Sequence, residues 1–437
     1  MHFALPINRK VKIAIVTLCR LFLGVVFIIF GLIRACNPIE GGHIVSDYIA
    51  AAGLHFFQPL STLLAVAFAS VEFAIGVGSL LGTNIKKTSL YTALFLLFLT
   101  PFSFYTTYVS PVTTTTTLDG PIIKELTSCW VYLFFLWVAI QLFVWRKYSK
   151  TIFTNRTEWS IGPTTMAFAV LISAYSYFRL PVIDLTPYRT GLNISKYLAS
   201  QELTKDDIEW NEDNLFCIKH IEKVTTKKGE QIEALQLYDQ KEGDVSKKII
   251  GKEGYTFLLI ADDLSDSNTS ARHQLNRLYD YARNNGYSFY CLTATNPSSN
   301  EAEEYIVESG GAEYPMVNAD TKVLRRMIQS KPGLLLLKDG VVYHKWSHFY
   351  LPELKDKLEN CAEGEMQVES MRMKALHICC VFGLIIIGIL ALDWFFGLLI
   401  WLFRKLTGKA PKEEKKDDAD AEMAEAPTNE DKKEENT

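Results

Sequence analysis

Six apolar runs of membrane-spanning length constrain this chain more than any other feature. A helix needs about 20 mostly apolar residues to cross the hydrocarbon core of a bilayer. Hydrophobic residues make up 49% of the 437 residues, so part of the chain belongs in lipid. The sequence therefore predicts an α-helical membrane bundle of about six transmembrane helices, with the lipid bilayer as a partner. The runs are 11–33, 60–81, 90–109, 130–145, 164–178 and 375–403.

Basic residues flank every second connection between these runs. Lys and Arg are retained on the cytoplasmic side of membrane proteins. The first run has about 23 residues, which is longer than the apolar core of a cleaved signal peptide. The pattern predicts a multi-pass protein of a bacterial inner membrane, with both termini cytoplasmic and residues 180–374 periplasmic. The flanking cations are Arg9, Lys10, Lys12, Lys86, Lys87, Arg146, Lys147, Lys150, Arg156, Arg404, Lys405 and Lys409.

Charge and cysteine content exclude several classes of function. The formal net charge is only -4, and no block of Lys and Arg is present that would neutralise a run of phosphates, so nucleic acid is not an expected partner. The eight cysteines are scattered, with no C-x-x-C pair and no Cys/His cluster at ligand spacing. We therefore expect neither a disulfide scaffold nor a metal site.

Three charged residues lie deep inside the apolar runs. Arg20 is about nine residues into the first run, ~13 Å deep at 1.5 Å per residue. An unpaired charge there costs at least ~2.5 kcal/mol. Because Glu72 and Asp393 reach a similar depth, we predict an intramembrane polar site in which Arg20 pairs with Glu72 and Asp393 either joins them or faces water. Such a site holds protons, a quinone or another small molecule, or it only fixes helix packing; the sequence leaves both open.

The first two runs carry motifs of a known membrane family. The stretch 20–34 (RLFLGVVFIIFGLIR) followed by 72–82 (EFAIGVGSLLG) resembles the DoxX-like family of four-helix membrane proteins, related to the MauE group. The likeness covers about residues 8–147, with Arg20, Gly24, Gly31 and Glu72 at the family's positions. Together with 180–188 (LPVIDLTPY), the whole chain is similar to the longer DoxX-like proteins of the Bacteroidota. The resemblance implies redox chemistry with a quinone or a thiol partner; the residues themselves demand no cofactor.

One departure from those relatives concerns thiol chemistry. The longer relatives carry a Cys-Gly-Cys-Phe-Gly stretch in an outer loop, where Thr115 and Thr117 stand in this chain. A threonine hydroxyl cannot exchange disulfides, so a dithiol step at this loop is lost. Cys36 and Cys129 are the remaining candidates nearby, and we interpret both as inert small hydrophobic residues.

The segment after Gly254 alternates strand and helix patterns. Strands are predicted at 255–261, 287–293, 333–337 and 341–346, and helices at 270–284, 300–309 and 322–329. A βαβ order followed by a hairpin with Asp339-Gly340 at its turn indicates a mixed sheet with helices on its faces. This order resembles the thioredoxin fold, so the fold class is a membrane bundle plus a soluble α/β thioredoxin-like domain.

The thioredoxin-like segment lacks its redox motif. Residues 262–270 (DDLSDSNTS) stand where a thioredoxin carries C-x-x-C, and Cys291 lies inside a predicted strand, where a core role is favoured. Lys331-Pro332 stands at the place of the family's cis-proline, so we predict a cis bond there. A loop of this kind holds extended peptides in the family, which points to binding or scaffolding.

These patterns divide the chain into six parts, and they leave the function open between two classes. The first is an inner-membrane protein of envelope redox chemistry; the second is a non-catalytic scaffold whose periplasmic domain binds an envelope protein. Whether the chain is an enzyme is not decided, and transport ranks last because no repeat is visible. The parts are 1–147 (DoxX-like), 148–188 (fifth span and outer motif), 189–253 (polar, mixed, with a few strands), 254–360 (thioredoxin-like), 375–403 (sixth span) and 408–437 (a charged cytoplasmic tail expected to be disordered).

Overall fold

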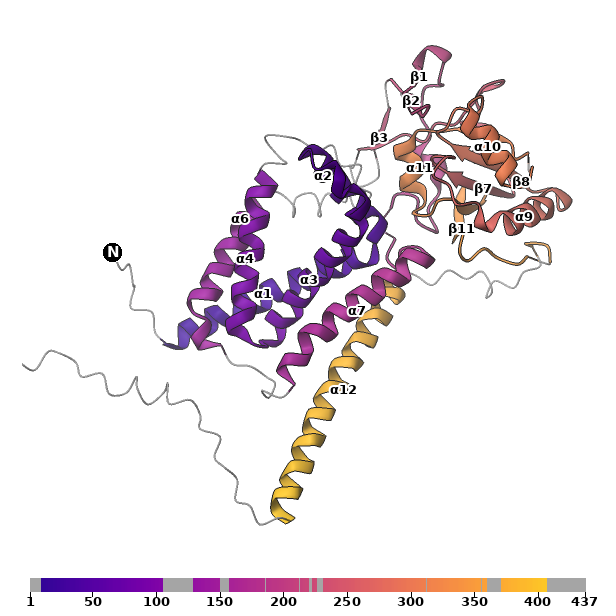
Figure 1. The fold of residues 1–437 in the computed structure, drawn as a ribbon. Coiled ribbons are helices and arrows are strands. Elements are labelled where there is room, and N and C mark those ends of the chain that lie inside the picture. Colours follow the sequence, from indigo (N-terminus) through magenta and orange to yellow (C-terminus); the bar gives the residue numbers. More distant parts are fainter. Residues whose placement is uncertain are drawn as a thin grey trace, which may run out of the picture. The chain divides into compact units, whose positions relative to one another are not determined.

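The computed structural model describes residues 9–104, 129–149, 157–359 and 371–406, apart from 185, 212, 220–221, 226–230, 312 and 355. The chain divides into two compact units, Met1–Gly383 and Leu384–Thr437, and each is described by itself. The first unit holds a set of apolar helices and an α/β domain (Figure 1). The Thr115/Thr117 loop and the charged tail lie outside the described residues.

Four helices of the described residues are long and apolar enough to cross a membrane: Arg9–Cys36, His55–Leu81, Glu158–Arg179 and Met373–Phe403. A fifth apolar helix, Cys129–Val144, is shorter, and part of the third apolar run lies outside the described residues. Membrane-length helices are thus confirmed, and the count of six spans remains a prediction. The helices are α1 (Arg9–Cys36), α2 (Pro38–Ala51), η1 (His55–Leu60), α3 (Ser61–Leu81), α4 (Ile85–Phe104), α6 (Cys129–Val144), η3 (Arg146–Tyr148), α7 (Glu158–Arg179) and α12 (Met371–Leu406).

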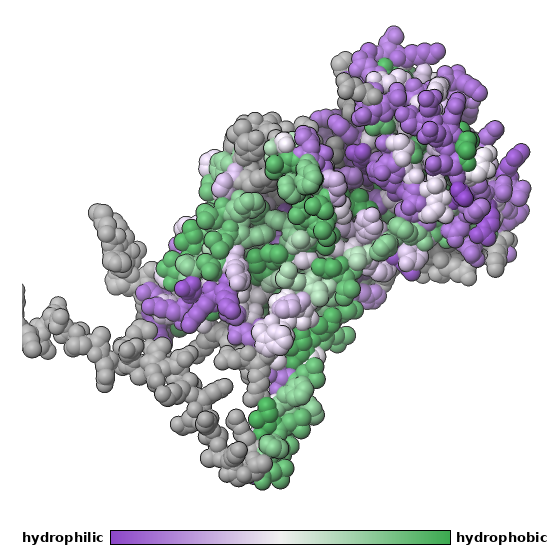
Figure 2. Space-filling model, in the orientation of Figure 1, coloured by the Kyte–Doolittle hydropathy of each residue, from purple (hydrophilic) through white to green (hydrophobic). Residues whose placement is uncertain are grey.

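These helices are apolar on their outer faces as well as inside. Leu23, Phe27 and Leu142 are fully buried in a shared core, whereas Phe98 and Leu171 are more than two thirds exposed. A helix that is apolar all round is expected in lipid rather than at a water-facing surface. Figure 2 shows the same contrast: hydrophobic residues cover these helices, and hydrophilic residues cover the α/β domain.

Glycines set the distance between α1 and α3. A Cβ atom on Gly31 would lie 2.6 Å from the backbone nitrogen of Phe73, and one on Gly76 would lie 2.6 Å from that of Ile28. Side chains larger than hydrogen are therefore excluded unless the helices separate. The sequence feature of closely spaced glycines is explained by helix packing.

The α/β domain is built on a seven-stranded mixed sheet. Its strand order is β11-β10-β7-β8-β9-β5-β6, in which β7, β8 and β9 run parallel and β10, β11, β5 and β6 pair antiparallel with their neighbours. The central strand β7 is buried along its whole length, which explains its continuous apolar sequence. The strands are β5 (Tyr238–Asp239), β6 (Gly243–Asp244), β7 (Tyr255–Ala261), β8 (Ser288–Thr293), β9 (Met316–Asn318), β10 (Gly333–Lys338) and β11 (Val341–Ser347).

Two apolar layers cover the sheet. Alternate residues of β7 point to opposite faces, so Phe257 and Leu259 pack with α9, while Leu258 and Ile260 pack with α11. The mixed sheet with helices on its faces is confirmed. The covering helices are α8 (Ser246–Ile250), α9 (Arg272–Asn284), preceded by η6 (Thr269–Ala271), α10 (Asn300–Glu308) and α11 (Thr321–Met327).

The segment 189–253 completes the layer on the α11 face. Ile194, Phe216 and Leu235 are fully buried against the residues of that face. Two of its strands, β5 and β6, extend the main sheet beside β9, and the other four form two small antiparallel pairs. The segment therefore shares a core with the sheet. Its other elements are η4 (Ile194–Tyr197), η5 (Lys205–Asp207), β1 (Ile208–Trp210), β2 (Phe216–Ile218), β3 (Lys223–Thr225) and β4 (Gln231–Glu233).

Candidate functional site

Glu72 pairs with Arg34, not with Arg20. The Arg34 Nη1 and Glu72 Oε2 atoms are 2.5 Å apart, and the Glu72 side chain is only 3% exposed. The guanidinium also lies 5.3 Å from the centre of the Phe68 ring. The structure does not show the expected Arg20–Glu72 pair; Glu72 is held instead by Arg34, which lies just beyond the predicted first run, 11–33.

The antiparallel register of α1 and α3 explains this correction. The glycine contacts place Gly31 beside Phe73 and Gly24 beside Leu80, so Glu72 lies within one turn of Arg34. Arg20, in contrast, lies beside the end of α3, ~18 Å along the helix axis from Glu72 at 1.5 Å per residue. Counting depth from the start of each apolar run missed this register, whereas matching the glycines of the two spans would have found it.

The other two predicted members of the intramembrane site are not brought to Glu72 by the described contacts. Arg20 Nη1 donates to Ser149 Oγ at 3.0 Å, directly after η3. Asp393 belongs to the second unit, Leu384–Thr437, and its membership in the site stays a prediction. The described intramembrane pair is Arg34–Glu72.

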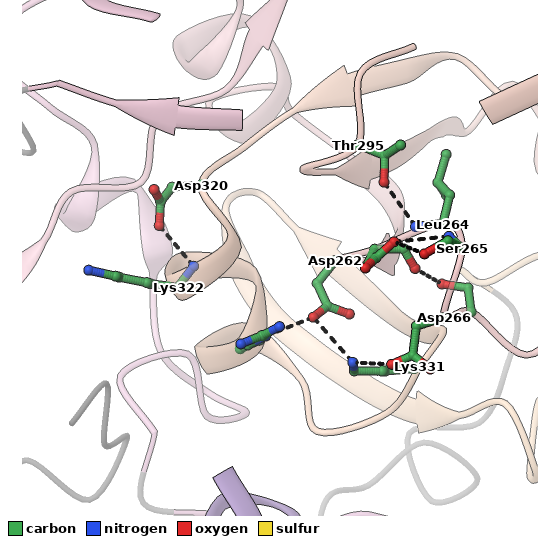
Figure 3. Close-up of polar contacts among 11 residues, drawn as sticks. Asp262, Leu264, Ser265, Asp266, Thr295, Asp320, Lys322 and Lys331 are labelled. Atoms are coloured by element: carbon green, nitrogen blue, oxygen red, sulfur yellow. Dashed lines mark hydrogen bonds and ion pairs between the residues drawn. The ribbon is translucent and has the colours of Figure 1, made fainter. Parts of the chain in front are cut away.

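A second polar site lies where β7 ends in the α/β domain. We call Asp262, Asp266, Arg325 and Lys331 the Asp262 cluster (Figure 3). Asp262 Oδ2 accepts from Arg325 Nε at 2.9 Å and lies 3.7 Å from Lys331 Nζ, which in turn lies 2.6 Å from Asp266 Oδ2. The Asp262 side chain is only 5% exposed, so the two cations compensate a largely buried charge.

Local capping positions the cluster. Asp320 is the N-cap residue of α11, and its side chain accepts a hydrogen bond from Lys322 N at 2.8 Å. Helix α11 carries Arg325. On the other side, Thr295 Oγ1 accepts from Leu264 N at 2.9 Å and fixes the chain just after Asp262 (Figure 3). The Lys331–Pro332 peptide bond is cis, as predicted.

The Asp262 cluster borders a cavity of about 370 Å³, which we call the Gln329 pocket. The Gln329 side chain is 6% exposed, and neither its Oε1 nor its Nε2 has a hydrogen-bond partner. His348 Nδ1 lies 3.0 Å from Ser330 Oγ, while its Nε2 is buried without a partner. The sequence analysis did not single out Gln329 or His348. The remaining lining includes Ile39, His43, Thr62, Tyr177, Ile260, Asn268, Leu324, Ile328 and Phe349.

The histidines of the pocket are neutral at pH 7. Burial, helped by the positive charges of Arg325 and Lys331, lowers the pKa of His43 to about 4. Burial also lowers the pKa of His348. Both rings therefore offer one donor and one acceptor nitrogen rather than a positive charge.

Among the described residues, the lining of the pocket contains no cysteine and no metal-ligand cluster. Cys291 is fully buried in β8, where burial raises the pKa of its thiol to about 12 and disfavours the reactive thiolate. Among the described residues, no group of three or more His, Cys, Asp and Glu side chains is placed to hold a metal.

An acid-sensitive ion pair connects residues 180–188, the predicted outer motif, to strand β11 of the sheet. Lys345 Nζ, on a side chain only 7% exposed, lies 2.9 Å from Asp184 Oδ2 and also donates to Met327 O. Burial opposes the charge of Asp184, but the Lys345 ammonium outweighs it and holds the pKa of Asp184 below its ordinary 3.8.

We therefore expect the Asp184 contribution to stability to be complete above about pH 4 and to be lost as the pH falls further, since the folded state binds this proton less readily than the unfolded one. Thermal unfolding of the full chain between about pH 6 and about pH 3 measures it. In Asp184→Asn this part of the acid dependence should be absent, whereas Asp213→Asn, at an exposed loop, should leave it intact. An unchanged pH profile in Asp184→Asn would contradict the assignment.

Comparison with protein-family models, with curated proteins and with solved structures finds no match for this chain. The fold and the two polar sites therefore rest on the sequence and the structure alone.

Proposed function

We propose that this chain is an inner-membrane protein of the DoxX-like type whose periplasmic α/β domain is a thioredoxin-like module that binds an extended peptide segment of an envelope protein without thiol exchange. The observation that carries the proposal is the polar, cysteine-free Gln329 pocket at the end of β7, beside the Ser330–Pro332 loop. On this proposal the Asp262 cluster takes the place of a dithiol. Binding is therefore favoured over catalysis.

The order of elements supports the thioredoxin-like part of this proposal. Four of the seven strands are arranged as β11-β10-β7-β8, with β7 and β8 parallel, β10 antiparallel to both β7 and β11, and α9 between β7 and β8. The short strand β9 comes between β8 and β10 in the chain and pairs with β8. This is the arrangement that the sequence resemblance implies. The loop before β10 lies at the edge of the Gln329 pocket, where it is placed to contact a peptide.

Peptide binding is tested with the full chain in lipid nanodiscs, probed against an array of peptides of about 12 residues that tile envelope protein sequences. We expect a small set of sequences to be captured. Asp266→Trp, which places a bulky ring at the pocket, should abolish capture, and Asp213→Trp, away from the pocket, should not. If both variants bind as well as the wild-type chain, the pocket is not the binding site.

The membrane layout is a separate prediction. Six spans with alternating basic flanks place the α/β domain in the periplasm and both termini in the cytoplasm. Protease added to intact spheroplasts is therefore expected to cleave within residues 180–374 and to leave residues 408–437 intact until the membrane is lysed. Protection of 180–374 together with loss of the C-terminal residues would refute this layout.

A quinone-linked redox role is the second candidate, and the Arg34–Glu72 pair is the observation that favours it. A buried ion pair beside the Phe30 and Phe68 rings combines polar and aromatic contacts of the kind a quinone head group uses. If this role holds, purification with native lipids yields bound quinone that is lost in Glu72→Gln and kept in Glu40→Gln, at another buried glutamate. Absence of quinone, with no change in envelope thiol status on deletion, would count against it.

A further inference from the structure

Gln329 carries a hydrogen-bonding group that the fold leaves unused. Its side chain is nine-tenths buried, lines the Gln329 pocket, and has no partner for either amide atom. A buried polar atom without a partner lowers the stability of the folded state. The folded state therefore retains this amide at a cost in stability, as expected of a group that serves a ligand.

The charged side chains of the Asp262 cluster, in contrast, are already paired with one another. Asp262 is compensated by Arg325 and Lys331, and Lys331 also pairs with Asp266, so the Asp262 cluster contains two cations and two carboxylates. A charged ligand group would have to break one of these pairs. An uncharged ligand would leave all of them in place.

His348 adds a second neutral group. His348 Nδ1 lies 3.0 Å from Ser330 Oγ, which itself donates to Pro332 O at 2.7 Å. The ring is neutral because burial lowers its pKa. His348 Nε2 is buried beside the pocket without a partner.

We infer that Gln329 binds the main chain of one uncharged residue of an extended peptide, with Oε1 accepting its N–H and Nε2 donating to its C=O. The N–H and C=O of a single residue in a strand point to the same side, as they do when two residues of an antiparallel pair exchange both hydrogen bonds. One carboxamide satisfies both groups. The inference rests on the proposed peptide binding and names the residue and the ligand group that carry it.

The test couples a change in the protein to a change in the peptide. Peptides captured by the array are resynthesised with a single N-methyl group at each position in turn, which removes one N–H donor. With the wild-type chain in nanodiscs, we expect one uncharged position where N-methylation weakens binding at least tenfold, about 1.4 kcal/mol. Gln329→Met should weaken binding of the unmethylated peptide by a similar factor. For this variant, N-methylation at the same position should have no further effect on binding.

Gln236→Met is the matched control, since Gln236 is the other described buried glutamine and does not line the pocket. It should leave the N-methyl profile unchanged. Substituting Asn and Gln side chains within the peptide distinguishes a side-chain amide from the main chain as the bound group; dependence on those side chains instead of on N-methylation would overturn the main-chain assignment.

The stability of the unliganded protein gives an independent readout. Gln329→Met removes two unsatisfied polar atoms at similar volume, so the melting temperature should not fall. A clear fall would show that the amide has a structural partner and would overturn the inference. If the wild-type chain captures no peptide, the proposed function fails; if it captures peptides that Gln329→Met binds equally well, only the role of Gln329 fails.

Discussion

Replacing Arg34 with methionine is expected to lower the free energy of unfolding by about 3–5 kcal/mol, the usual loss when one partner of a buried ion pair is removed. Glu72 would be left 3% exposed inside the helix bundle with an uncompensated charge. The measurement is thermal or SDS-induced unfolding of the purified chain in detergent. Glu72→Met should cost less than Arg34→Met, because the guanidinium that it leaves behind is 27% exposed.

The double variant and a distant arginine provide the controls. Arg34→Met/Glu72→Met should recover most of the loss, because a well-packed apolar pair often replaces a buried ion pair without destabilisation. Arg20→Met should not be coupled to Glu72→Met, since the register of α1 and α3 places the two residues far apart. Coupling of Glu72 to Arg20 instead of Arg34 would show that the helices pack in another register.

Gly76→Ala is expected to destabilise the bundle by about 3 kcal/mol, the upper part of the range for overpacked cores. The new Cβ atom would lie 2.6 Å from the backbone nitrogen of Ile28 and 2.9 Å from the carbonyl carbon of Phe27. Backbone atoms cannot turn aside as a flexible side chain does, so α1 and α3 must move apart. The same unfolding assay measures the loss.

Gly388→Ala is the matched control within an apolar helix. A Cβ atom there would meet nothing within 4 Å, so we expect no loss and a gain of up to roughly 0.5–1 kcal/mol from the reduced backbone freedom of alanine. Tolerance of alanine at Gly76 would contradict the close approach of α1 and α3. It would also remove the basis for the Arg34–Glu72 register.

Local patterns in the α/β domain predicted its elements well. The predicted strand at 255–261 coincides with β7, and the hairpin turn at Asp339-Gly340 has both residues at positive φ, as a two-residue hairpin turn requires. The strand β9 was missed, because its three residues are too few for a periodic signal. The length of the apolar helices could likewise be predicted from the sequence, because the thickness of a bilayer sets the length of each spanning helix separately.

Contacts between segments that are far apart in the chain could not be predicted from the sequence in the same way. Arg20 and Arg34 lie in the same span, and only the packing of α1 on α3 through their glycines selects Arg34 for Glu72. The Gln329 pocket could not be predicted from the sequence for a similar reason. A single glutamine carries no periodic signal, and its lack of partners emerges only when residues far apart in the chain surround it.

The sequence by itself determined which segments are apolar helices and which form the α/β domain, because these properties depend on local composition and spacing. Only the tertiary structure decided that Arg34 holds Glu72 and that Gln329, which lines a pocket beside compensated charges, has a buried amide without a partner. The physical reason is that ion pairs and unsatisfied polar atoms are defined by distances of a few ångströms between segments. Those distances are set by packing, here by glycine contacts in the bundle and by the two apolar layers of the sheet.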